Sequence, residues 1–131
     1  MKNVTEVLYI GLGGFCGAVS RVYVSGVMHR IFGKGFPYGT LAVNSVGSFL
    51  LGLISYLAIS RHIMGDNMRM AVTLGFLGAF TTFSTFSYET FDLIKAGNHY
   101  LSLVNIITNI LICIIMVALG FVAATLIDKA F

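Results

Sequence analysis

The feature that most constrains the fold of this chain is a run of nineteen uncharged residues, from Met70 to Tyr88. An α-helix needs about 20 apolar residues to cross a hydrocarbon core of about 30 Å. With 57% hydrophobic and only 10% charged residues, the chain cannot cover a soluble core with polar surface. The sequence therefore predicts an all-α integral membrane protein. We expect one domain over residues 1–131, with transmembrane helices over approximately residues 6–29, 39–60, 70–88 and 101–127.

The third predicted span contains residues that favour an interruption of the helix. Gly75 and Gly78 are weak helix formers, and the side chains of Thr81 and Thr82 can bond to nearby backbone. We therefore expect the helix to break near the membrane midplane. Irregular backbone at that depth persists only where protein buries it or where it lines a watery cavity. Carbonyl groups freed by the break would suit a small cation.

The same span is unusually polar after the expected break. Five of the seven residues from Thr81 to Ser87 carry hydroxyl groups, and Phe83 and Phe86 lie among them. Hydroxyl groups that bond to their own helix, and phenylalanines that only pack, would account for any one of these residues. Their density in one short window favours a polar interior face. If the helix resumes after Thr81, Phe83 and Phe86 share one face of it.

Other polar residues inside the apolar runs allow more than one interpretation. Arg21 in the first span faces the protein interior or a water cavity, or it extends to the lipid headgroups. Asn44 in the second span braces backbone or donates its amide to an anion. Ser102, Asn105 and Asn109 give the fourth span a polar face, for which hydrogen bonds between helices are the simpler explanation.

Small residues predict where helices approach closely. Gly13 and Gly17 lie four residues apart in the first span, and Gly47 and Gly52 lie in the second. Such residues allow two helix backbones to come into contact in a membrane.

The charged residues bear on partners and orientation. Eight Lys and Arg residues are scattered singly, so no basic tract predicts a nucleic-acid partner. Four spans would place both chain ends on one side of the membrane. The basic residues outside the spans are then Lys2, Arg61, Arg69 and Lys129 on that side and Arg30, Lys34 and Lys95 on the other. Orientation in the membrane follows the imbalance of Lys and Arg between the two sides, and here the two sides are nearly balanced. The chain can therefore insert either way up, which permits an antiparallel homodimer.

The segment from Gly78 to Ser87 closely resembles the third-helix signature of the Fluc (CrcB) fluoride channels, and Glu89 lies where that signature often has an acid. Members of that family are small four-helix subunits that assemble as antiparallel dimers. The resemblance implies a passive fluoride-selective channel, not an enzyme, which exports cytoplasmic fluoride through two pores in the cell membrane. The second subunit would be another copy of this chain or a paralogous one.

The resemblance also implies roles for individual residues. The residues of the ion pathway would be Arg21, Asn44, Phe83, Ser84, Thr85, Phe86 and Glu89. Hydroxyl and amide groups would replace the water around fluoride, and aromatic ring edges carry partial positive charge. Backbone carbonyls of Gly78 and Thr81 from both subunits would hold a structural sodium ion, Na+, at the dimer axis.

Two other functions are compatible with parts of the pattern. A small multidrug exporter shares the four-span plan but needs a carboxylate embedded in the membrane. Here Glu6 and Glu89 lie at the ends of predicted spans, and the embedded charge is Arg21, which favours anions. A non-transporting subunit of a larger membrane complex would show the same packing glycines. The window rich in Phe, Ser and Thr argues against it.

Overall fold

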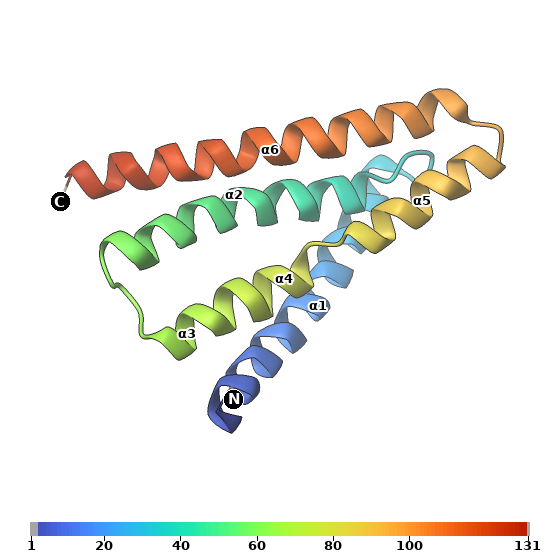
Figure 1. Cartoon of the computed structure of the whole chain (residues 1–131). Helices are drawn as coiled ribbons and strands as arrows, with labels where there is room; N and C mark the ends of the chain where they lie inside the picture. Colours follow the sequence, from blue (N-terminus) through green and yellow to red (C-terminus); the bar gives the residue numbers. More distant parts are fainter. Residues whose placement is uncertain (1–2, 131) are drawn as a thin grey trace.

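The computed structural model describes residues 3–130, and within them all regular structure is helical (Figure 1). The elements are α1 (Val4–Phe32), α2 (Tyr38–Ser60), α3 (Asp66–Met70), the π-helix η1 (Ala71–Leu77), α4 (Gly78–Phe80), α5 (Phe83–Lys95) and α6 (His99–Ala130). With Asp66–Lys95 taken as one unit, four helices are long and apolar enough to cross a membrane. The predicted all-α membrane fold is confirmed, and the protein is a multi-pass membrane protein.

The third span is interrupted where the sequence indicates. α4 ends at Phe80, Thr81 and Thr82 have extended backbone, and α5 begins at Phe83. The predicted break is therefore confirmed, and it lies near the middle of the unit from Asp66 to Lys95.

The helix after the break is longer than expected. We expected a polar link from residue 89 to residue 100, but α5 continues to Lys95. Glu89 therefore lies within a helix. The residues after Tyr88 include Glu, Leu and Lys, which favour helix although two of them are charged. Hydropathy alone therefore placed the end of the helix too early.

Helix α1 packs against η1, and glycine makes this contact possible. A Cβ atom at Gly13 would overlap the carbonyl of Ala71, and one at Gly17 would overlap the carbonyl of Phe76. The close approach predicted for this face of α1 is confirmed. Its partner is the wide turn of a π-helix, which the sequence did not indicate.

Helices α2 and α6 lie side by side along most of their length (Figure 1). Gly52 on α2 lies against the backbone of Val117 on α6, so the close contact predicted for Gly52 is also confirmed. At one end of this pair, Arg61 forms an ion pair with Asp128, and the Tyr56 hydroxyl donates to the same carboxylate at 3.3 Å. These contacts join α6 to α2, and the half of the third span after the break packs against α6.

Candidate functional site

The break in the third span is braced by one side chain from α2. The Thr82 N–H donates to Oδ1 of Asn44 at 2.7 Å, and Nδ2 of Asn44 donates to the Thr82 carbonyl at 3.0 Å. An unpaired backbone group at this depth would be costly, and Asn44 satisfies both groups of one residue. Of the two roles left open for Asn44, the structure shows the bracing of backbone. Its role toward an anion remains a prediction.

A chain of amides continues from Asn44 into α6. The second hydrogen of the Asn44 amide points to Oδ1 of Asn109 at 3.2 Å, and Nδ2 of Asn109 donates to Oδ1 of Asn105 at 2.8 Å. Nδ2 of Asn105 donates in turn to the Thr90 hydroxyl on α5 at 2.8 Å. The predicted hydrogen bonds between helices are confirmed for Asn105 and Asn109. Ser102 instead donates to the carbonyl of His99 in its own helix.

Hydroxyl groups surround the first turn of α5. The Thr82 side chain is the N-cap, because its oxygen accepts from the Thr85 N–H at 3.1 Å. The same hydroxyl bonds to that of Thr85 at 2.9 Å and lies 3.3 Å from that of Ser84. Ser84 and Thr85 are exposed on the subunit. A helix N-terminus carries partial positive charge, so this turn offers an anion both donors and a favourable field.

The two phenylalanines after the break touch each other but differ in burial. Their ring centroids are 5.4 Å apart, as expected for residues on one helix face. Phe86 is only 7% exposed, whereas Phe83 is 77% exposed. Phe83 is therefore available to lipid or to another protein chain.

Two shallow grooves meet at Asn44. Besides Asn44, one is lined by Phe83, Phe86, Asn109, Ile110, Cys113 and Ile114, and the other by Ser48, Leu51, Thr81, Thr82, Phe83 and Cys113. Cys113 lines both grooves, whereas the sequence, with a thiol where a hydroxyl group was expected, left the contribution of the fourth span open. Its position four residues after Asn109, on the same face of α6, was the signal that could have identified it.

The proposed sodium ligands lie at the end of α4. Because the backbone at Thr81 and Thr82 is extended, the last carbonyls of α4 lose the amide donors of a following helical turn. Gly78 is exposed on the subunit. The Thr81 N–H and hydroxyl both bond to the carbonyl of Leu77, at 3.0 and 2.9 Å. The donor chemistry, carbonyl oxygens at the negative end of a helix, fits a small cation.

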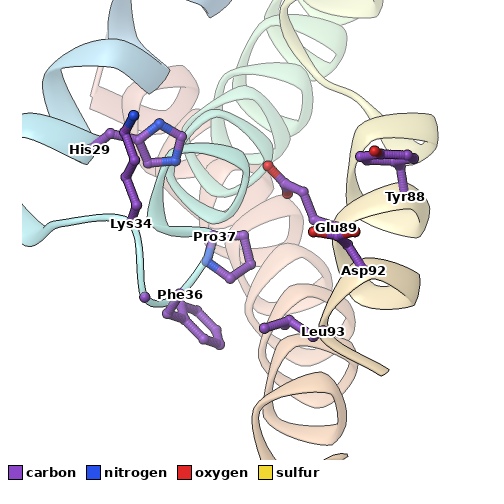
Figure 2. Close-up of a pocket in the computed structure, with 9 residues that line it drawn as sticks. His29, Lys34, Phe36, Pro37, Tyr88, Glu89, Asp92 and Leu93 are labelled. Atoms are coloured by element: carbon purple, nitrogen blue, oxygen red, sulfur yellow. The ribbon is translucent and has the colours of Figure 1, made fainter. Parts of the chain in front are cut away.

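Glu89 occupies a separate pocket (Figure 2). Its side chain points from α5 toward the end of α1 and the link that follows, where His29, Lys34 and Pro37 also line the pocket. One carboxylate oxygen of Glu89 is buried without a hydrogen-bond partner among residues 3–130. The structure therefore does not bring Glu89 into the grooves at Asn44.

Arg21 is also apart from the grooves. It is partly exposed on α1, and it lines neither of them. No ion pair within residues 3–130 involves it. Of the predicted pathway residues, the structure brings together Asn44 and the first turn of α5, and leaves Arg21 and Glu89 outside this cluster.

The amino-acid sequence of the chain matches a known family. The family described as "CrcB-like protein, Camphor Resistance (CrcB)" matches residues 8–121, which include the break, its brace and both grooves. The chain belongs to the CrcB family. Among its CrcB relatives is a protein of Geotalea daltonii named "Fluoride-specific ion channel FluC", which is 45% identical over 118 residues. That alignment covers 90% of this chain and 95% of the relative.

Other CrcB relatives carry the same name. The protein of Geotalea uraniireducens is 43% identical over 118 residues, with 90% of this chain and 95% of the relative covered. The protein of Dehalococcoides mccartyi is 42% identical over 124 residues, with 95% of each chain covered. Membership of the CrcB family weighs against a multidrug exporter and against a non-transporting subunit.

Proposed function

We propose that the protein is a passive, fluoride-selective ion channel that exports cytoplasmic fluoride. The observation that carries this proposal is the interrupted helix, whose break is braced by Asn44 and whose next turn exposes the donors of Ser84 and Thr85. The names of the relatives support fluoride as the ion. No catalytic chemistry is needed for this function.

The chemistry of the site suits a small, strongly hydrated anion. A channel must replace the hydration shell of the ion with groups that bind strongly enough for entry and weakly enough for exit. Hydroxyl groups of Ser84 and Thr85 and the amide of Asn44 supply donors, and the N-terminus of α5 supplies a favourable field. The ring edges of Phe83 and Phe86 add weak positive electrostatic potential.

The proposed assembly is an antiparallel dimer with two pores. Phe83, Ser84 and Thr85 are exposed on one subunit, and both grooves at Asn44 are open. A second copy that covers this face would enclose the ion pathway and remove the aromatic ring from lipid. The nearly equal numbers of Lys and Arg residues on the two sides support insertion in both orientations.

A structural sodium ion would join the two subunits. The carbonyls of Gly78 and Thr81 would hold it. They lie beside the extended residues between α4 and α5, where carbonyl groups lack the amide donors of a continuous helix. When bound, the ion supplies a fixed positive charge, which favours anions nearby. In this proposal the chain's own contribution is to hold the break open through Asn44.

Ion efflux from liposomes that contain the purified protein tests the function. We expect rapid efflux of fluoride and none of chloride. Phe83→Ile removes an aromatic edge, and Asn44→Asp replaces an amide donor with a negative acceptor, so both should abolish or strongly slow fluoride efflux. Ser87→Ala is the matched control, because the Ser87 hydroxyl already donates to the Phe83 carbonyl at 2.9 Å. Absence of fluoride efflux from folded wild-type dimer would overturn the proposal.

A further inference from the structure

The chain of amides behind the candidate pathway runs in one direction. Asn44 donates to Asn109, Asn109 donates to Asn105, and Asn105 donates to Thr90. The Thr90 hydroxyl then donates to the carbonyl of Phe86 at 2.7 Å. Each group in the chain has a partner, so the series is anchored in the backbone of α5.

The members of this chain behind Asn44 are almost fully buried. Asn105 is 0% exposed, Asn109 is 4% exposed and Thr90 is 8% exposed. Buried amides are held strongly to their partners, because an unpaired one would lose its hydrogen bonds without gaining water. Nδ2 of Asn109 also donates to the backbone carbonyl of Asn105 at 3.2 Å, which holds that side chain twice. The Asn109 oxygen is therefore fixed, facing Asn44.

This arrangement leaves Asn44 no free donor. One amide hydrogen is bound by the Thr82 carbonyl and the other by Oδ1 of Asn109. An anion that binds the Asn44 amide must displace one of these acceptors. The contact with Thr82 is part of a two-bond pair at 2.7 and 3.0 Å, whereas the contact with Asn109 is single and longer, at 3.2 Å. The Asn109 oxygen is the acceptor that an anion would replace.

We propose that the Asn109 side-chain oxygen is a fixed acceptor that competes with fluoride for the Asn44 amide and shortens the residence of the anion. Asn105 and Thr90 are the positioning residues, because they hold this oxygen in place. Neither lines the grooves at Asn44. The inference rests on the proposed function and adds to it the reason why a donor-rich site releases its anion.

The variant Thr90→Val tests this proposal, because it removes the hydroxyl that holds the Asn105 amide at nearly constant volume. The Asn105 side chain is then free to rotate, and Asn109 keeps the longer of its two bonds, to the Asn105 backbone carbonyl at 3.2 Å. Fluoride current across planar bilayers is measured against fluoride concentration. We expect the half-saturating concentration to fall about fivefold, which is the effect of losing one competing hydrogen bond. The maximal current should fall as well, because fluoride then leaves the site more slowly. Damage to the fold would reduce the current without tighter binding, so the direction of the first change separates the two explanations.

Two further variants complete the experiment. Thr90→Ser retains the hydroxyl and should restore both values. Thr108→Val removes a hydroxyl beside Asn109 that donates to the Val104 carbonyl at 2.7 Å and lies 3.4 Å from the Asn105 carbonyl, but bonds to none of the side-chain amides, so both values should stay unchanged. The proposal is overturned if Thr90→Val leaves half-saturation unchanged or raises it, or if Thr108→Val lowers it equally. Wild-type protein that passes no fluoride would instead overturn the proposed function.

A measurement on the wild-type protein keeps the test decisive if Thr90→Val does not fold. Side-chain amide signals of ¹⁵N-labelled asparagine are followed by NMR as fluoride or chloride is added. We expect fluoride to shift the signals of Asn44 and Asn109 together, since the anion takes the place of the Asn109 oxygen, and chloride to shift neither. A shift at Asn44 with Asn109 unchanged would overturn the proposal.

Discussion

The two halves of the interrupted span are held in place by different forces. The half before the break, Asp66–Phe80, is pressed against α1, where Gly13 and Gly17 leave room for backbone only. The half after the break, Phe83–Lys95, makes fewer contacts and is tied to α6 through the hydrogen bond between Thr90 and Asn105. The position of the first half therefore depends on close backbone packing, and the position of the second half depends on hydrogen bonds.

This difference suits a channel subunit. Contact between backbones is the stable way to pack helices in lipid, where burial of apolar surface gives no advantage. Such contact leaves no space for an ion. The half bound through amides and hydroxyl groups keeps exposed donors at its first turn, so the proposed ion pathway lies beside the half with fewer contacts. Three variants separate the contributions of the two halves.

The first variant, Gly17→Leu, disrupts the close backbone packing of the half before the break. Its side chain would overlap the Phe76 backbone, which cannot move aside as a side chain could. We expect a loss of more than about 3 kcal/mol, the upper end of the cost of overpacking, and little folded protein. Gly14→Ala is the control, since its Cβ would lie 3.9 Å from the Gly75 carbonyl, an ordinary contact. Size-exclusion profiles and melting in detergent measure both, and equal melting of the two variants would contradict the prediction.

The second variant, Asn44→Leu, removes the two hydrogen bonds that brace the backbone between the halves. It leaves the N–H and the carbonyl of Thr82 without their partner. Because a buried unpaired polar group costs about 1–3 kcal/mol, we expect a loss of about 3 kcal/mol in the free energy of unfolding. Ser45→Ala is the control, because among residues 3–130 the Ser45 hydroxyl bonds only to the carbonyl of Leu41 in its own helix. Thermal melting measures the loss, and a variant as stable as wild type would show that the break does not need its brace.

The third variant, Thr82→Val, removes the N-cap at the start of the second half. It removes the oxygen that accepts from the Thr85 N–H, while Thr82→Ser keeps it. Loss of such a cap costs about 1 kcal/mol, so we expect the first turn of α5 to open more often. Hydrogen exchange at the Thr85 amide should become about fivefold faster, as such an energy difference implies. Unchanged exchange there would contradict the capping role.

Much of the architecture was predictable because membrane insertion imposes simple rules. Four apolar runs and the mixture of glycine and threonine around Thr81 predict four spans and a break, and the structure confirms both. The same rules failed after Tyr88, because charged residues lower hydropathy without ending a helix. The family could be identified from the segment Gly78–Ser87, since its residues are consecutive.

The candidate site was predictable only in part. Asn44 and the first turn of α5 were identified and lie together, whereas Glu89 lines a pocket with His29 and Lys34. The part of Cys113 was left open, because a thiol in an apolar run resembles ordinary packing.

The number of spans, the position of the break and the family all follow from residues that are close together along the chain. The tertiary structure decided which groups meet: that both groups of Thr82 bond to Asn44, and that the amides of α6 continue to Thr90. The physical reason is the range of the interactions involved. Hydropathy and helix propensity act between neighbours along the chain, but a hydrogen bond between residues 44 and 109 depends on how two helices pack.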